Sequence, residues 1–98
     1  MDINLNLKKF KKVSNNLYIR GVPKIKGESL YKDNMITYIS DKISKGNFNF
    51  IKDIYNQFAI VYVERDFIFC SVDKNRSFPI FYNYKKNSIT ISSSTIFF

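Results

Sequence analysis

The chain contains no histidine and only one cysteine, Cys70, among its 98 residues. Without an imidazole, neither a Ser-His-Asp triad nor a Cys-His pair can be assembled from this chain. The same shortage excludes the usual structural zinc site, which needs several Cys and His ligands. Cys70 cannot form a disulfide within the chain, which fits a reducing compartment. Catalysis confined to this chain would depend on carboxylates or lysines, and we expect no metal and no cofactor.

Glycines and long apolar runs are also scarce. The three glycines, Gly21, Gly27 and Gly46, form neither a G-x-G-x-x-G nor a G-x-x-x-x-G-K-[ST] phosphate-binding pattern. The longest uninterrupted apolar run, residues 58–63, is far shorter than the ~18–20 residues of a membrane span. Since no apolar signal sequence follows the first residues, we expect a cytoplasmic protein without membrane association.

Positive charge exceeds negative charge, giving a formal net charge of +8 at pH 7. Most of the excess lies in residues 1–26, which contain seven Lys or Arg and one Asp. Thirteen of the sixteen cations are Lys and eleven Asn accompany them, a composition that an AT-rich genome also produces. We interpret the excess as a solvated basic N-terminal segment. A nucleic-acid surface formed by residues 8–12 with Tyr18 and Tyr31 is the alternative, although no RNP-like, KH or helix-turn-helix pattern accompanies it.

Hydrophobic periodicity predicts a single α+β domain over residues 1–98. Residues 1–14 are a basic segment that forms either a first strand or an arm, and the core extends over residues 15–98. Residues 15–22 have strand-like composition. A helix is predicted from an N-cap at Asp33 to Gly46, because four apolar residues between them recur at helical spacing. A second short helix is predicted after Asn47.

After Asn56 the periodicity becomes strand-like. Strands are predicted at residues 58–63, 67–72, 80–84 and 88–93, joined as two hairpins. The solid apolar run of the first strand argues for burial on both of its faces. We expect the four strands to lie side by side in one antiparallel meander sheet packed against the two helices.

The loop "DKNRSFP" (73–79) between the hairpins has the most specific pattern in the chain. Asp73 can accept hydrogen bonds from loop amides, and Pro79 restricts the backbone where the next strand begins. Arg76 is a planar cation that could hold a carboxylate or backbone carbonyl groups. We interpret the three residues as loop architecture, with contact between Arg76 and a ligand or partner as the alternative.

The segment "QFAIVYVERDFIFCSVDKNRSFPIFYNYKKNSITISSS" (57–94) resembles the second half of the glutaminase domain of glutamine-dependent asparagine synthetases. In that class II amidotransferase family, a G-x-F-A strand precedes a hairpin partner ending in Asp, a short loop, a P-L-Y-Y-like strand and a strand finishing in A-S-E. The matching segments here are "QFAIVYV", "FIFCSVD", "KNRSF", "PIFYNY" and "ITISSS". The segments "DNMITYISDKI" and "NFIKDIY" are similar to the family's preceding helix pair. The resemblance, over roughly residues 17–95, implies a partial N-terminal-nucleophile hydrolase fold.

The family's catalytic groups are not matched. The resemblance requires a cysteine directly after the initiator Met, where this chain has Asp2, and Cys70 is predicted to be a small core residue in mid-strand. The family's R-H-R-G-P-D stretch and the Ser-Gly-Gly loop of its ATP site have no counterpart. Its oxyanion-hole Asn-Gly pair falls near Arg20 and Gly21, so only the glycine is kept. The Asp that holds the glutamine amino group is matched by Asp33, with plain helix capping as the alternative. We therefore expect no catalytic residue in this chain.

Together these observations predict a degenerate, non-catalytic glutaminase-like domain, a pseudoenzyme of bacterial type that acts as a structural or interaction module. The expected partner is an asparagine-synthetase-like domain or subunit, or a second copy, because an uncovered edge strand and the apolar residues 96–98 favour pairing with another chain. One alternative is a functional component of a glutamine-dependent asparagine synthetase whose nucleophile comes from another chain. The other is a small basic nucleic-acid-binding protein.

Overall fold

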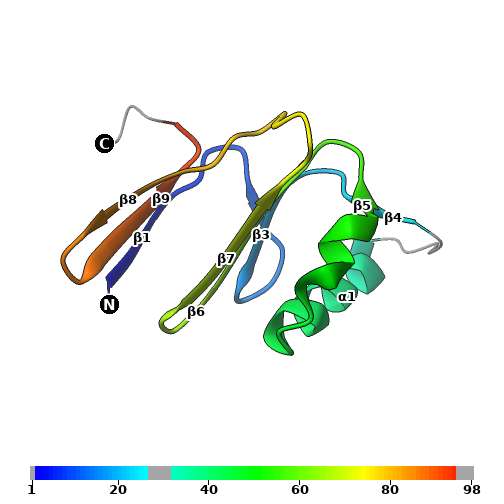
Figure 1. The fold of residues 1–98 in the computed structure, drawn as a ribbon, viewed down its shortest axis with the longest axis horizontal. Coiled ribbons are helices and arrows are strands. Elements are labelled where there is room, and N and C mark those ends of the chain that lie inside the picture. The colour runs from blue at the N-terminus through cyan, green and yellow to red at the C-terminus, as the bar shows by residue number, and fades with distance from the viewer. Residues whose placement is uncertain (1, 27–31, 95–98) are drawn as a thin grey trace.

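Two β-sheets and a layer of helices are stacked in this protein (Figure 1). The structure is a computed structural model that describes residues 2–26 and 32–94. Its elements are β1 (Asp2–Asn6), β2 (Lys11–Lys12), β3 (Leu17–Gly21), β4 (Lys24–Ile25), α1 (Lys32–Ser44), the 3-10 helix η1 (Phe48–Asp53), β5 (Ile54–Tyr55), β6 (Phe58–Glu64), β7 (Phe67–Val72), β8 (Phe81–Lys85) and β9 (Ser88–Ser92). Sheet A has the order β1-β9-β8, sheet B has the order β2-β3-β6-β7, and β4 pairs with β5.

Sheet B is the middle layer, with the helices on one face and sheet A on the other (Figure 1). Its strand β6 is apolar on both faces, and alternate side chains of a strand point to opposite faces. Phe58, Ile60 and Tyr62 join the buried cluster formed with α1 and η1. Ala59 and Val61, which are fully buried, point the other way toward sheet A. The chain thus has two apolar layers, one on each side of sheet B.

The helical layer follows from a stripe of apolar residues on α1. Met35, Ile39 and Ile43 recur every four residues and are all buried in the cluster against sheet B. Gly46, at φ +73°, ends the helix: its N–H donates to the Ile43 carbonyl at 3.0 Å, and the next N–H donates to the Lys42 carbonyl at 2.9 Å. This pair of bonds is the Schellman arrangement, so the predicted C-terminus of the helix is confirmed.

Sheet A is built from the two ends of the described chain. β9 pairs in parallel with β1, placing Ile3 opposite Ile89 and Leu5 opposite Ile91. β8 pairs antiparallel with the other side of β9. These four apolar side chains share the face directed at sheet B, and Ile91 is buried there. The basic N-terminal segment therefore contains a strand at residues 2–6, which decides between the predicted strand and the predicted arm.

The predicted single meander sheet is wrong. The two predicted hairpins form, but β6 and β7 belong to sheet B while β8 and β9 belong to sheet A. Two-residue turns join the strands within each hairpin, whereas eight residues, 73–80, join the hairpins to each other. That length allows the chain to cross the roughly 10 Å between stacked sheets. The second hairpin thereby covers the apolar face of β6 that the helices leave open.

Two local predictions are also corrected. The second predicted helix is the short 3-10 helix η1, followed by the strand β5, rather than an α-helix. Asp33 is not the N-cap of α1, because the helix already includes Lys32 and Asp33 lies in its first turn. A carboxylate in the first turn still interacts favourably with the partial positive charge of the helix N-terminus. What the structure retains of the predicted fold is its α+β character.

Candidate functional site

The loop between the sheets is organised around the Asp73 carboxylate. Oδ1 accepts hydrogen bonds from the backbone N–H groups of Phe58 at 3.4 Å and Ser77 at 3.2 Å, and Oδ2 accepts one from the Ser77 hydroxyl at 2.8 Å. The Arg76 N–H also donates to the Asp73 carbonyl oxygen at 3.0 Å. Burial raises the pKa of Asp73, but these hydrogen bonds outweigh it, so the pKa lies below its usual value of 3.8. Asp73 therefore has the architectural role that the sequence predicted.

Gly21 is the residue at which β3 contacts this loop. Its φ is +85°, and a Cβ there would lie 2.3 Å from the Gln57 carbonyl oxygen and 2.7 Å from a ring carbon of Phe78. The neighbouring Arg20 guanidinium lies over the same Phe78 ring, 4.3 Å from its centre. Gly21 is thus required by close packing between β3, β6 and the loop, whatever its match to the amidotransferase pattern.

The candidate site residues named from the sequence do not all lie close together in the structure. Gly21 and Asp73 lie at the same end of sheet B, because Gly21 pairs with Phe58 and Phe58 pairs through hydrogen bonds with Asp73. Asp33 is exposed on α1 and lines neither of the two pockets described below. Glutamine binding by a Gly21–Asp33 pair therefore stays a hypothesis from the sequence.

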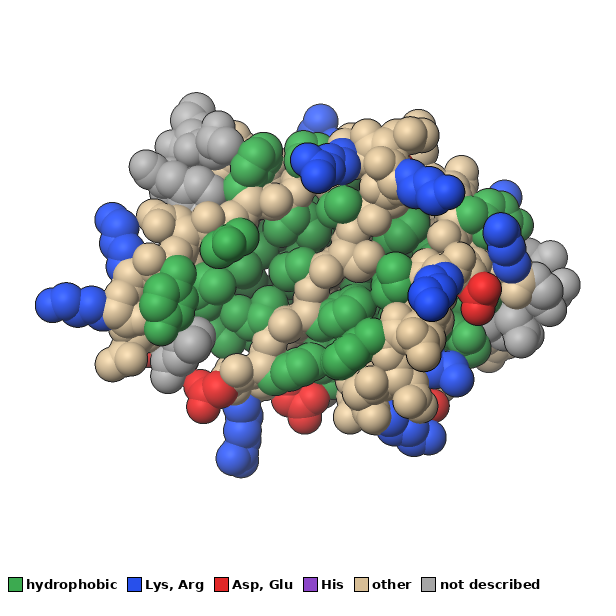
Figure 2. All heavy atoms as spheres, in the orientation of Figure 1, with side chains coloured by type: hydrophobic (Ala, Val, Ile, Leu, Met, Phe, Trp, Pro, Cys, Tyr) green, Lys and Arg blue, Asp and Glu red, His purple; other side chains and the backbone are tan. Residues whose placement is uncertain are grey.

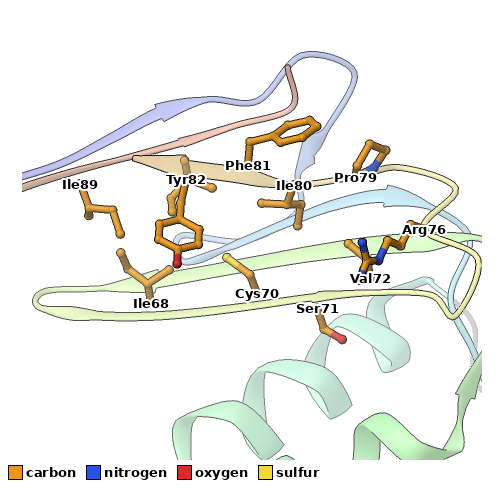
Figure 3. Close-up of a pocket in the computed structure, with 11 residues that line it drawn as sticks. Ile68, Cys70, Ser71, Val72, Arg76, Pro79, Ile80, Phe81, Tyr82 and Ile89 are labelled. Carbon is orange, nitrogen blue, oxygen red and sulfur yellow. The ribbon is translucent and has the colours of Figure 1, made fainter. Parts of the chain in front are cut away.

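A wide pocket of about 690 Å³ opens between the edge strands β7 and β8, at the border of the two sheets (Figure 3). We call it the open edge. Ile68 and Cys70 of β7 point across it toward Tyr82 of β8 and Ile89 of β9. Arg76 and Pro79 of the connecting loop also line it, and Arg76 has a positive φ of 51°. The lining of the open edge thus includes Arg76 and Pro79, which were named from the sequence, together with strand residues that were not named as site residues.

Tyr82 is the clearest feature of the open edge. It pairs with Ile91 in sheet A, so its side chain shares the face that is directed at sheet B. Ile91 is buried there, whereas Tyr82 is 72% exposed and its neighbour on the same face, Tyr84, is 56% exposed. Large rings on an inner face are normally covered. Sequence reasoning missed them because the predicted single sheet gave β8 no second sheet to face. The alternation Tyr-Asn-Tyr was the available signal.

Cys70 is exposed on β7, so the prediction that it is a core residue is wrong. Its thiol nevertheless points into the apolar space between the sheets, and burial raises its pKa to about 11. At pH 7 only about one thiol in ten thousand would then be ionised. No histidine exists to act as its base. The open edge therefore combines an apolar lining with a thiol that is protonated at neutral pH.

A second pocket, of about 640 Å³, is lined by the first residues of the same loop, 73–75, and by residues between Lys26 and Val72. Its lining combines an apolar floor that includes Ile54 and Phe58 with the three lysines Lys26, Lys52 and Lys74. Asp73 is the acidic residue in this lining, and its carboxylate is already engaged within the loop. This pocket is positively charged, a property that follows from the fold and not from the basic N-terminal segment alone.

The surface view separates charge from apolar area. In Figure 2, hydrophobic side chains are visible across the middle of the molecule between ridges of backbone and other uncharged side chains, while Lys and Arg project mainly around the rim. Among the described residues, no group of three or more His, Cys, Asp and Glu side chains is placed to hold a metal ion. The helices within residues 2–26 and 32–94 are all too short or too polar to cross a membrane.

Comparison with family models, curated proteins and solved structures found no match to this chain. The resemblance to the glutaminase domain of asparagine synthetases consequently has no support beyond the quoted segments. It has also lost the one-sheet arrangement that was expected to accompany it. The segment order itself coincides with the elements, since "QFAIVYV", "FIFCSVD", "KNRSF", "PIFYNY" and "ITISSS" fall on β6, β7, the loop, β8 and β9 in turn.

Proposed function

We propose that this protein is a non-catalytic, glutaminase-like interaction module that works in an assembly with an asparagine-synthetase-type protein. The observation that carries the interaction role is Tyr82, a large ring on the inner face of sheet A that remains 72% exposed. An uncovered inner-face ring beside two strand edges that no other described strand pairs with is a feature of surfaces that bind another chain. The synthetase-type partner is inferred from the sequence resemblance alone.

The non-catalytic character is supported by the groups that the chain contains. Amide hydrolysis by this family needs a thiolate and a base close to it. Here the thiol lies in an apolar space with its pKa raised to about 11, and position 2 holds Asp2 in place of a cysteine. Gly21 packs against Gln57 and Phe78, which occupy the direction in which a side chain at this position would project. Binding without turnover agrees with these features.

Two measurements test the proposal. Purified protein incubated with glutamine is expected to release glutamate no faster than the Cys70→Ala variant or a protein-free blank. Release that exceeds the blank and disappears in Cys70→Ala would overturn the non-catalytic role. The second measurement is affinity isolation of the protein from its native cells, with mass-spectrometric identification. A synthetase-type protein carrying a Ser-Gly-Gly ATP loop is expected in stoichiometric amount, and its absence would remove the partner from the proposal.

A further inference from the structure

The backbone of β7 offers unpaired hydrogen-bonding groups at every second residue. In an antiparallel ladder, residues alternate between those bonded to the neighbouring strand and those directed away from it. The Asp73 N–H donates to the Phe58 carbonyl oxygen at 3.2 Å, which sets this alternation for β7 against β6. The N–H and C=O groups of Ile68, Cys70 and Val72 are therefore directed outward, away from sheet B. Within the described residues, β7 is the last strand on that side of the sheet.

The side chains of the same three residues point into the open edge. Ile68, Cys70 and Val72 all line the pocket between the sheets, below Tyr82. A strand added along β7 would thus extend the backbone ladder of sheet B and also continue the apolar layer under sheet A. The unpaired backbone groups and the apolar side chains thus belong to the same strand. This combination distinguishes the edge from an apolar patch without unpaired backbone groups.

The opposite edge of sheet B is protected by contrast. It ends in β2, which has two residues, Lys11 and Lys12, both exposed. Short edge strands carrying lysine are a common device against pairing with another chain. The six residues of β7 include no charge and no proline, and β8 has its first charge at Lys85. The chain therefore blocks one edge and leaves the other available.

We propose that β7 pairs antiparallel with β7 of a second copy, about a two-fold axis that passes beside Cys70 and runs perpendicular to the sheets. In this register Cys70 lies opposite Cys70 of the second copy, and Ile68 lies opposite Val72 of the second copy. All three outward-directed residues then form hydrogen-bonded pairs, with their side chains on the same face. The inference rests on the interaction role proposed above and assigns the open edge to a second copy of this chain, so a synthetase-type partner would bind elsewhere on the dimer.

Symmetry favours a second copy over an unrelated strand. The occupant of the open edge must cover β7 in sheet B and also Tyr82 in sheet A, which lie in two stacked layers. A two-fold axis perpendicular to the layers returns each layer to its own level, so the second copy supplies its own β8 and Tyr82 at the required height. The paired residues of β7 are uncharged, so the ladder itself places no like charges opposite each other although each chain has a net charge of +8.

The wild-type protein is expected to form a concentration-dependent dimer with twice the 11.6 kDa mass of the chain, measured by light scattering after size exclusion. The test uses the self-pairing of position 70. Cys70→Lys and Cys70→Glu should each weaken dimerisation by about a hundredfold or more, because each places like charges opposite each other. An equimolar mixture of the two variants should recover a heterodimer. Asn15→Lys, which adds the same charge in an exposed turn beside β2, should leave the dimer intact.

A monomer at every concentration up to the solubility limit would overturn the inference. So would failure of the Lys and Glu variants to associate with each other when both retain the wild-type circular dichroism spectrum. Amide exchange by NMR tests the unmodified protein: exchange at Ile68, Cys70 and Val72 should slow as concentration rises. Protection of these amides only after a synthetase-type protein is added would assign the edge to that partner instead. Glutamate release would overturn the proposed function without touching the dimer, so the two failures are distinguishable.

Discussion

The hydroxyl of Ser77 donates a 2.8 Å hydrogen bond to the carboxylate of Asp73, four residues earlier, and this contact closes the loop that connects the two sheets. The same carboxylate accepts the Phe58 N–H at the start of β6. One side chain therefore joins the end of β7, the start of β6 and the turn that leads to β8. This junction lies where the chain passes from the first hairpin to the second.

We predict that acid weakens the fold through Asp73. Because the pKa of Asp73 is lowered in the folded state, its ionised form contributes stability above the usual value of 3.8, and this contribution is lost as pH falls through the lowered pKa. Urea denaturation of the wild type and Asp73→Ala at pH 7 and near pH 3 should show a large difference at pH 7 that shrinks in acid. Asp53→Asn, at an exposed carboxylate, is the control, and an equal pH response of both variants would contradict the prediction.

Gly21→Ala and Gly46→Ala form a matched pair that separates backbone strain from close packing. Both glycines have positive φ, +85° and +73°, but Cβ space is occupied at Gly21 and open at Gly46. Gly46→Ala should cost about 1 kcal/mol of unfolding free energy from strain alone. Gly21→Ala should cost at least about 2–3 kcal/mol, because the new methyl group overlaps the Gln57 carbonyl oxygen and the Phe78 ring. Equal shifts in the two urea midpoints would refute the close contact.

Truncation of Ile91 tests the second apolar layer. Ile91 is 2% exposed and packs from sheet A toward sheet B, so Ile91→Ala should cost about 2–4 kcal/mol. Its neighbour Thr90 points to the outer face of sheet A, and Thr90→Ala should cost less than about 1 kcal/mol. Chemical denaturation at a single pH measures both. A small effect at Ile91 would mean that the second hairpin does not cover sheet B.

The thiol of Cys70 should be unreactive at neutral pH despite the exposure of the residue. Burial raises its pKa to about 11, so the rate of alkylation by iodoacetamide should be low at pH 7 and continue to rise with pH up to about that value. The same chain unfolded in urea, where the thiol has an ordinary pKa of roughly 8.5, provides the control. A rate that levels off near pH 9 in the folded protein would show that the thiol is hydrated.

Much of the local structure was predictable because it depends on neighbours in the sequence. The apolar stripe of α1 and its glycine stop at Gly46 are properties of one segment, as are the two-residue hairpin turns. The loop role of Asp73 was predictable for the same reason, since its carboxylate accepts hydrogen bonds from Ser77 only four residues away, whereas the further bond from the Phe58 N–H depends on the fold. The 3-10 form of η1 was missed because tight and ordinary helical turns share similar apolar spacing over six residues.

The open edge was not predictable in this way. Whether Tyr82 lies on an inner or an outer face depends on which layer β8 joins, and no local pattern reports that. The apolar run of β6 did indicate burial on both faces, and this signal implies a second covering layer. The prediction of one four-stranded sheet did not include this second layer. Without a second layer, no candidate site could be placed between β7 and β8 from the sequence.

By itself, the sequence determined the strands β3, β6, β7, β8 and β9, the main helix, the loop anchored at Asp73 and the absence of an imidazole-based catalytic system, because each of these depends on residue chemistry or on contacts over a few positions. Only the tertiary structure decided that the two hairpins stack instead of joining edge to edge, that Gly21 packs against Phe78, and that Tyr82 and Cys70 meet at an uncovered border. Those features depend on which segments, distant in the sequence, cover the two faces of β6. Packing over the whole domain decides this, because no local pattern specifies it.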